Sequence, residues 1–421
     1  MSDNPKITKV TAYTLRSNFE WTLVKVYSGE MYGIGEAGAS PGLSGMAPYF
    51  DKLLKGEDPF KMNRLEQKMR YATLSAGTGA YHFISAISTA IYDLVGKILN
   101  VPIYKFLGGD REQLRIYADA HGGKALESMD AMLMPVYYEW MEDENIEKNR
   151  LLTTNNPVHG RLSVEKWNDD YSPESYANRA KEMIGEGFTA VKFDFDVPTP
   201  YTRPNEMRSG ELNIKDIKYL GEIAAAIRDA IGDEYDFMLD LHWRYNLNTA
   251  VRLCKEIEKY NPRWVEDPIP AQMTISNLSL LKTIVSNTSI PIETGENLYG
   301  VSQFKELLTT GVRVWSPDLV KAGGIWEGKR IVDLASLYEI EYSPHNEGSP
   351  IATMMEAHVA SSSNTFGVIE FHGHDVPFWE RMVKAKRKVI DKGFLHLNDE
   401  PGLGLELAED EIKKIDENFN L

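Results

Sequence analysis

The chain contains 421 residues, of which 43% are hydrophobic and 26% are charged, a composition typical of an ordinary soluble globular protein. Its 62 acidic and 46 basic residues give a net charge of −16, which argues against nucleic acid or an anionic membrane surface as a partner. A small anionic substrate is compatible with this charge, because a bound divalent cation reverses the local field. The N-terminal residues lack the apolar core of a signal peptide, so we expect a cytoplasmic protein.

The first part of the chain, residues 1–112, predicts an α+β domain. Segments rich in β-branched and aromatic residues cover residues 6–36, with turn glycines among them. Residues 44–107 then carry helical patterns that end at Gly108 and Gly109. This order of β-rich segments followed by helical segments differs from the pattern of the rest of the chain, so we expect a separate N-terminal domain.

The longest apolar stretch of the chain is residues 84–104. It contains Asp93, Lys97 and Asn100, which a helix that crosses a membrane would carry only at a high cost. The pattern therefore predicts an amphipathic core helix, and we expect no membrane partner.

From about residue 114 onward, short apolar segments alternate with amphipathic helical patterns. This alternation is typical of βα units with a parallel sheet. The predicted strands are residues 115–120, 189–195, 236–242, 263–268, 290–296, 312–319, 340–345 and 366–371. Eight such strands predict a closed barrel, which we assign to residues 113–385. We expect the last residues, 386–421, to return to the N-terminal domain.

Residues 122–172 do not follow this period. The segment is long, mixed in polarity and rich in aromatic residues, so we interpret it as an insertion after the first barrel strand. Such an insertion either caps the site or forms a contact between subunits. We favour the subunit contact, and we expect a homo-oligomer between a dimer and an octamer.

Acidic and imidazole side chains recur at regular intervals over the C-terminal half of the chain. They are Asp240 with His242, Glu266, Glu296, Asp318, His345 and Glu370. The successive gaps of 26, 30, 22, 27 and 25 residues match one βα unit each. Equivalent strand ends meet at one mouth of a (β/α) barrel, so the pattern predicts a single site.

Asp240, Glu266 and Glu296 each end a predicted strand. Three carboxylates at one mouth repel one another unless a cation lies among them. Hard oxygen ligands suit Mg²⁺, which keeps positions open for water and substrate. Any one of these residues alone could instead cap a helix or pair with an arginine. Together they predict a magnesium site.

His345 and Asp318 end neighbouring predicted strands. A carboxylate one strand away can orient an imidazole and raise its basicity, which predicts a general base. The alternative is a packed histidine that bonds to a backbone carbonyl. His242 lies two residues beyond Asp240, so both side chains face the barrel interior. It is either a fourth metal ligand or a general acid, and we favour the acid because imidazole prefers softer metals.

Other polar residues carry weaker signals. Lys192 lies on a predicted interior strand face, where an ammonium group is costly unless it meets an anion; it could also extend to the strand end or pair with Asp194. Arg244 could bind a substrate carboxylate or hydroxyl, or form a surface ion pair. His372 and His374 look like a metal pair but follow the last strand, so we expect a loop role for them.

Several segments taken together resemble the enolase superfamily, and within it the mandelate racemase subgroup. They are ISAISTAIYDLVGKILNVPIYKFLGG, WVEDPIP, PIETGENLYG, WSPDLVKAGGI, YSPHNEGSP and GVIEF. The resemblance covers nearly the whole chain. It implies a (β/α)7β TIM-like barrel with an N-terminal α+β capping domain that the C-terminal tail completes.

The resemblance also implies roles for the site residues. It implies metal ligands at Asp240, Glu266 and Glu296, a catalytic dyad of Asp318 and His345, and substrate contact at Glu370. The Asp-x-His-x-Arg pattern at Asp240, His242 and Arg244 is similar to that of sugar-acid dehydratases, in which the histidine is the acid.

One departure from the family pattern bears on the reaction. Many members carry Lys-x-Lys on the second barrel strand, and the second lysine is a base on the opposite face of the substrate. Here the segment is Lys192-Phe193-Asp194. A racemase needs two bases around one carbon, so this change counts against racemisation of the mandelate type.

We therefore predict a hydro-lyase that dehydrates an aldonate such as arabinonate, xylonate, gluconate or galactonate to the 2-keto-3-deoxy acid. His345, held by Asp318, would take the C2 proton, and His242 would protonate the leaving C3 hydroxyl. Mg²⁺ and Lys192 would stabilise the enediolate. We expect Glu370, Arg244 and Asp194 to contact substrate.

Two alternatives stay open. One is a racemase or epimerase of a 2-hydroxy acid, in which His242 or Lys192 is the second base. The other is a non-catalytic metal-binding protein on the same fold. The identity of the acid sugar would depend on loops near residues 17–21 and 39–45 and on the insertion at 122–172, because hydroxyl stereochemistry decides it.

Overall fold

The computed structural model describes residues 5–17, 20–38, 40, 42–122, 169–203, 209–269 and 278–421. Most of the predicted insertion at residues 122–172 lies outside these ranges, as do parts of the two loops expected to set the substrate. Their roles, and the expected homo-oligomer, stay predictions.

The N-terminal domain is a three-stranded antiparallel sheet covered by helices. Its strands, in the order β1-β2-β3, are β1 (Lys9–Arg16), β2 (Glu20–Ser28) and β3 (Met31–Ala37). Its helices are α1 (Ala47–Leu54), α2 (Met62–Ala72), α3 (Thr78–Leu99) and α4 (Ile103–Phe106). Two glycines of β3 let α3 approach the sheet closely, because a Cβ atom on Gly33 would lie 1.9 Å from the carbonyl oxygen of Ala90.

Helix α3 is the core helix that the apolar stretch predicts. It is long and apolar enough to cross a membrane by length and composition, but 83% of its most apolar window is buried inside the fold. It packs between the N-terminal sheet and the barrel, where Gly323 donates its N–H to Ser85.

The second domain contains all eight predicted barrel strands. They are β4 (Gln113–Asp119), β5 (Ala190–Asp194), β6 (Asp236–Asp240), β7 (Val265–Glu266), β8 (Ile292–Thr294), β9 (Val314–Trp315), β10 (Glu341–Tyr342) and β11 (Ile369–Phe371). Consecutive strands from β4 to β10 pair in parallel. The barrel closes because β11 pairs with β4 and Tyr342 forms a bridge with Phe366.

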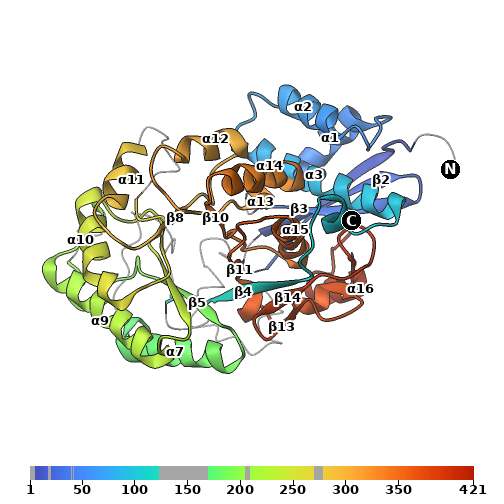
Figure 1. Cartoon of the computed structure of the whole chain (residues 1–421). Helices are drawn as coiled ribbons and strands as arrows, with labels where there is room; N and C mark the ends of the chain where they lie inside the picture. Colours follow the sequence, from blue (N-terminus) through green and yellow to red (C-terminus); the bar gives the residue numbers. More distant parts are fainter. Residues whose placement is uncertain are drawn as a thin grey trace.

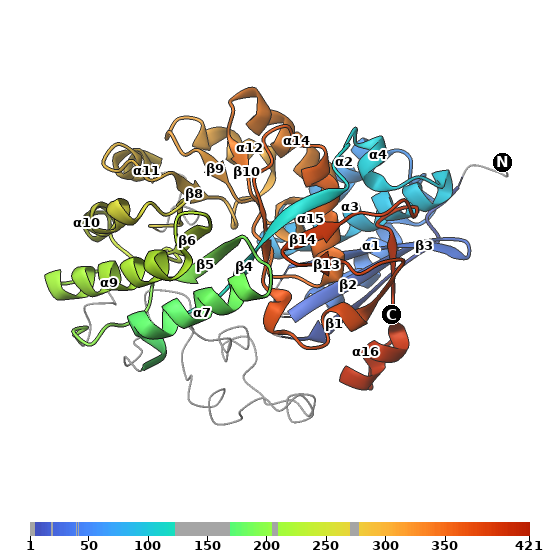
Figure 2. The ribbon, with the colours of Figure 1, turned by 60° about the horizontal axis from the view of Figure 1, so that its bottom comes forward.

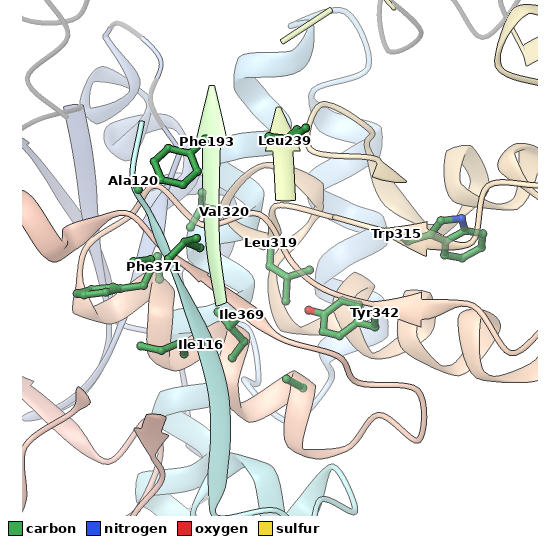
Figure 3. Packing of buried hydrophobic residues seen from close by; sticks show 14 of the residues in the cluster. Ile116, Ala120, Phe193, Leu239, Trp315, Leu319, Val320, Tyr342, Ile369 and Phe371 are labelled. Atoms are coloured by element: carbon green, nitrogen blue, oxygen red, sulfur yellow. The ribbon is translucent and has the colours of Figure 1, made fainter. Parts of the chain in front are cut away.

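Helices surround this barrel (Figures 1 and 2). They are α7 (Pro173–Gly185), α9 (Ile214–Ile231), α10 (Leu247–Ile257), α11 (Leu278–Val285), α12 (Gly300–Leu307), α13 (Leu319–Ala322), α14 (Gly324–Leu337) and α15 (Pro350–Ser361). Apolar residues on the outward strand faces, such as Ile116, Phe193 and Leu239, belong to the large core between strands and helices (Figure 3). The predicted barrel with its capping domain is therefore confirmed.

The side chains that face the barrel interior form an apolar layer and, next to it along the strands, a polar layer. Six buried residues form a small cluster of their own: Tyr117, Ala190, Met238, Trp264, Val314 and Val368. Two positions farther along five of these segments lie Asp119, Lys192, Asp240, Glu266 and Glu370. Because side chains two residues apart share a strand face, the polar residues form the next layer, toward the carboxyl ends of the strands.

The C-terminal segment lies against the N-terminal domain (Figure 1). It contains β12 (Val383–Ala385), β13 (Ile390–Asp391), β14 (Phe394–His396), β15 (Leu405–Leu407) and α16 (Glu409–Ile415). The Tyr13 hydroxyl donates to Asp416 at 2.7 Å, and Lys25 lies 2.6 Å from Glu409. β14 also pairs antiparallel with the start of β4. The segment thus contacts both domains.

Candidate active site

Lys192 lies at the centre of the polar layer. Its Nζ atom lies 3.2 Å from Oδ2 of Asp240, 2.9 Å from Oε2 of Glu266 and 2.5 Å from Oε1 of Glu370. Burial alone would lower the pKa of this lysine, but the surrounding carboxylates outweigh burial and raise the pKa well above its usual range. Lys192 is therefore a buried ammonium ion that joins three of the predicted site residues, while Asp194 lies beside His242.

The buried carboxylates outnumber the ammonium groups that contact them. Glu266, Asp267 and Glu296 each offer an oxygen, and these oxygens lie within 4.8 Å of one another. Burial first, and then the charge of Asp240, raise the pKa of Glu266 well above its usual range. Among the described residues, Oε1 of Glu266 and Oδ2 of Asp267 are buried and accept no hydrogen bond.

This arrangement fits a hard divalent cation, because buried carboxylate oxygens that accept no hydrogen bond are costly and oxygen donors suit Mg²⁺. Asp240 adjoins the same group through the paired strands β6 and β7, where it lies opposite Glu266. The sequence pattern omits Asp267. Its position directly after a strand-end glutamate is a signal that could have identified it.

His345 and Asp318 lie in direct contact. The Nδ1 atom of His345 is 3.0 Å from Oδ2 of Asp318, and its Nε2 atom is 3.1 Å from Oε2 of Glu296 and 3.8 Å from Glu370. Burial would lower the pKa of this imidazole, but Glu296 and Glu370 outweigh it and raise the pKa to about 10. Its Nδ1–H therefore faces Asp318, and its Nε2 faces the carboxylates.

A second lysine, which the sequence pattern omits, contacts this dyad. The Nζ atom of Lys321 lies 3.0 Å from Oδ2 of Asp318 and 3.3 Å from Oε1 of Glu347. Although burial opposes ionisation of Asp318, Lys321 and His345 lower its pKa to about 2. The signal for Lys321 is its place in WSPDLVKAGGI, one helical turn after Asp318.

His242 lies among three carboxylates. Its Nδ1 atom is 3.1 Å from Asp196 and 3.9 Å from Asp194, and its Nε2 atom is 3.4 Å from Oδ2 of Asp240. Burial opposes protonation of the ring, but these charges, Asp240 first, raise its pKa well above the usual value. Asp196 is another omission of the sequence pattern; it continues the period of two that begins at Lys192.

The backbone at His242 adopts an uncommon conformation, with φ of 38° there and 56° at Trp243. Residues other than glycine adopt this left-handed region at a cost, and such residues cluster at functional sites. The His242 N–H donates to Oδ1 of Asp240 at 2.9 Å, which holds the turn. Arg244 follows two residues later and is fully buried.

Histidines beyond the last barrel strand also reach the mouth. The Nε2 atom of His372 lies 3.3 Å from Oδ2 of Asp119, and the His121 and His372 rings are 4.5 Å apart. Burial lowers the pKa of His372 to about 4, so its ring is neutral near pH 7. His374, in contrast, lies 3.4 Å from Glu186. The two histidines do not share a site.

Comparisons with known proteins agree with this architecture. The family model described as the mandelate racemase/muconate lactonizing enzyme N-terminal domain matches residues 2–108, and the enolase C-terminal domain-like model matches residues 175–411. The chain is 30% identical over 415 residues to a protein of Haloferax volcanii named D-xylonate dehydratase, covering 97% of this chain and 88% of that one. It is 25% identical to one of Xanthomonas oryzae named D-galactonate dehydratase, covering 98% and 95%.

Solved structures give the same result. A mandelate racemase/muconate lactonizing enzyme-like protein from Rubrobacter xylanophilus aligns with a TM-score of 0.84 at 32% identity, covering 98% of each chain. A mandelate racemase/muconate lactonizing enzyme from Jannaschia sp. CCS1 aligns with a TM-score of 0.77 at 28% identity, covering 99% of each chain. Both domain models and a full-length relative therefore agree, and the chain belongs to the mandelate racemase/muconate lactonizing enzyme family of the enolase superfamily.

Proposed function

We propose that this protein is a Mg²⁺-dependent hydro-lyase that dehydrates an aldonate, such as xylonate, arabinonate, gluconate or galactonate, to the 2-keto-3-deoxy acid. The observation that carries the proposal is the pair of imidazoles on opposite barrel strands. His345 follows β10 and His242 follows β6, four strands apart in a closed barrel of eight. Relatives named D-xylonate, D-gluconate and D-galactonate dehydratase support this substrate class.

Asp240, Glu266 and Glu296 would hold the metal ion, and Asp267 offers a further oxygen beside Glu266 and Glu296. When bound, Mg²⁺ supplies positive charge where negative charge develops on the substrate carboxylate, and it makes the adjacent C2 proton more acidic. Lys192 supplies a second positive charge at the same place, because its ammonium lies within 3.2 Å of both Asp240 and Glu266. Glu370 contacts both Lys192 and His345, and we expect it to contact the substrate.

His345 would act as the general base. Its Nδ1–H is held by Asp318, so the neutral ring, which a cation held by Glu296 would favour, carries its lone pair on Nε2, the atom that faces the metal carboxylates. Nε2 takes the C2 proton, and the electron pair of the C2–H bond moves into the carboxylate to form the enediolate. Charge on Glu296 and Glu370 sets the proton affinity of this ring, and a cation on Glu296 offsets that charge.

His242 would act as the general acid. Asp196, Asp194 and Asp240 favour its protonated form. The imidazolium donates its proton to the C3 hydroxyl, the C3–O bond breaks, and water leaves as the enediolate electrons form the C2–C3 double bond. The resulting enol then tautomerises to the 2-keto-3-deoxy acid. One base and one acid in different protonation states are what elimination of water needs.

A racemase or epimerase is the alternative on the same fold. It needs a second base that can receive and return a proton at C2. The surroundings of His242 oppose that role, because Asp194 and Asp196 are not among the proposed metal ligands and would still favour its protonated form when a cation offsets the charge of Asp240. Lys192 is also held as an ammonium ion by three carboxylates. Neither group is therefore suited to be a base, and dehydration is favoured.

The test is a screen of an acid-sugar library with Mg²⁺, in which 2-keto-3-deoxy product and C2 deuterium incorporation from D₂O are both measured. We expect keto-deoxy product from at least one pentonate or hexonate, and none from the His345→Asn variant. A His345→Asn variant that dehydrates at the wild-type rate would overturn the role of His345. Incorporation of C2 deuterium into recovered substrate with inverted configuration, and without loss of water, would favour the epimerase.

A further inference from the structure

One carboxylate oxygen of Asp318 contacts two side chains, an imidazole and an ammonium group. Oδ2 lies 3.0 Å from Nδ1 of His345 and 3.0 Å from Nζ of Lys321. The other oxygen, Oδ1, accepts the N–H of Val320 at 3.0 Å at the start of α13. The carboxylate is thus fixed from three directions, and the position of Lys321 bears directly on the atom that orients His345.

Lys321 is itself held in a buried position. Its side chain is only 7% exposed, and its second partner is Oε1 of Glu347 at 3.3 Å. An ammonium ion in such a place is costly unless carboxylates compensate it, so Lys321 cannot leave Asp318 without a large loss. Glu347 follows His345 by two residues, so the two partners of Lys321 lie in the two segments that carry the dyad, one after β9 and one after β10.

The capping domain contacts Lys321 and also its partner Glu347. The N–H of Gly38, just after β3, donates to the carbonyl of Val320 at 3.2 Å. A Cβ atom on Gly38 would lie 2.9 Å from Cγ of Lys321 and 3.0 Å from Cγ2 of Val320. The indole N–H of Trp21, on β2, donates to the backbone carbonyl of Glu347 at 3.1 Å. The stem of Lys321 packs close to residue 38, where an added side chain would force Lys321 or Val320 to shift.

We propose that Lys321 is a positioning residue that couples the docking of the capping domain to the orientation of the His345–Asp318 dyad. The inference rests on the proposed role of His345 as the base. Gly38 fixes the stem of Lys321, the ammonium fixes Asp318, and Asp318 fixes the imidazole. Contact with the capping domain is thereby transmitted to the group that removes the C2 proton, through side chains that do not touch the substrate.

The test uses the full-length enzyme with Mg²⁺ and the acid sugar that wild type dehydrates. The variants are Lys321→Met, Lys321→Arg, Gly38→Ala and the double variant with Lys321→Met and Gly38→Ala. Gly79→Ala is the matched control, because its added Cβ atom makes an ordinary contact of 3.7 Å with Leu43. The measurements are kcat and KM for dehydration, the rate of C2 deuterium exchange, and thermal unfolding of each variant.

We expect Lys321→Met to lower kcat and the C2 exchange rate together by about 10²-fold with KM nearly unchanged, because the misplaced base fails in the transition state. Lys321→Arg restores part of the loss, because it keeps the positive charge. Gly38→Ala lowers kcat by about tenfold, but it adds little to Lys321→Met, because a shared pathway makes the effects non-additive. Gly79→Ala behaves as wild type.

Two results would overturn the inference. One is a loss from Gly38→Ala that is fully additive with that from Lys321→Met. The other is a Lys321→Met variant that folds and retains wild-type kcat. If Lys321→Met does not fold, the inference is tested with Lys321→Arg and Gly38→Ala. Each should then lower kcat while KM stays nearly unchanged, and a wild-type kcat in both would overturn the inference. A wild-type enzyme inactive on every acid sugar would instead refute the proposed function.

Discussion

Asp196 holds the Nδ1 side of His242 at 3.1 Å, and the two residues directly follow the neighbouring barrel strands β5 and β6. The pair resembles the His345–Asp318 pair on the opposite side of the barrel, where the corresponding distance is 3.0 Å. Each imidazole thus has its own aspartate. The two rings differ in what else they meet, because His242 also lies near Asp194 and Asp240.

This relationship predicts that Asp196→Asn separates the two halves of the reaction. Loss of one carboxylate lowers the proton affinity of His242 and frees its ring, so we expect the rate of water loss to fall by about 10²-fold. Proton removal by His345 should continue, so the rate of C2 deuterium exchange into recovered substrate should rise relative to the rate of water loss. Asp233→Asn, at an exposed position, is the control. An Asp196→Asn variant that loses exchange and dehydration equally would contradict the separate roles.

Metal binding is predicted to change stability as well as activity. If Mg²⁺ binds the folded protein alone, an excess of about 100 times its dissociation constant raises the unfolding free energy by about 2.7 kcal/mol. We expect a chelator to abolish dehydration and to remove this increment in urea unfolding. Glu266→Gln should lose most of the Mg²⁺-dependent increment, whereas the exposed Glu234→Gln should keep it. An equal increment in both variants would argue against Glu266 as a ligand.

We predict that the stability of the protein depends on pH through His358, which is not part of the candidate active site. Its Nδ1 accepts the N–H of Tyr104 at 3.0 Å, and its Nε2–H donates to the carbonyl of Leu403 at 3.1 Å, so only the neutral ring satisfies both contacts. Burial lowers its pKa to about 4 from an ordinary value of 6.5. The folded pKa is depressed, so the unfolded chain binds the proton more tightly. The stabilisation is complete above pH 6.5 and is lost as the pH falls through about 4.

The corresponding measurement compares wild type with His358→Leu by urea unfolding between pH 7.5 and pH 4. From the size of the pKa shift we expect the unfolding free energy of wild type, relative to that of His358→Leu, to fall by about 3 kcal/mol over this range. A difference between the two proteins that stays constant from pH 7.5 to pH 4 would show that His358 does not titrate in this way.

Close packing of the capping domain gives a fourth prediction. Gly33→Ala places a Cβ atom against the carbonyl of Ala90 and the backbone of Leu94 on α3, and neither backbone can yield easily. We expect a loss of about 1–3 kcal/mol in unfolding free energy, as for other overpacked interiors. Gly79→Ala should stay within about 0.5 kcal/mol of wild type in the same urea titration. Equal stabilities of the two variants would mean that α3 can move away from the sheet.

The sequence by itself determined the order and type of the barrel elements. All eight predicted strands are present, because each is a short apolar segment followed by a polar residue at its carboxyl end, and such patterns are local. The regular spacing of Asp240, Glu266 and Glu296 then followed from the length of a βα unit. Their roles as ligands, and the dyad roles of Asp318 and His345, stay predictions that the geometry supports.

Only the tertiary structure decided which charged groups meet. Lys192 contacts Glu370 on the last barrel strand, and this pair forms only when β11 closes the barrel against β4. Lys321 and Asp196 gave weak signals, because a charge inside an apolar pattern is compatible with many partners. Docking of the capping domain places Gly38 against Lys321. Such contacts depend on the closure of distant segments, which local pattern and spacing do not encode.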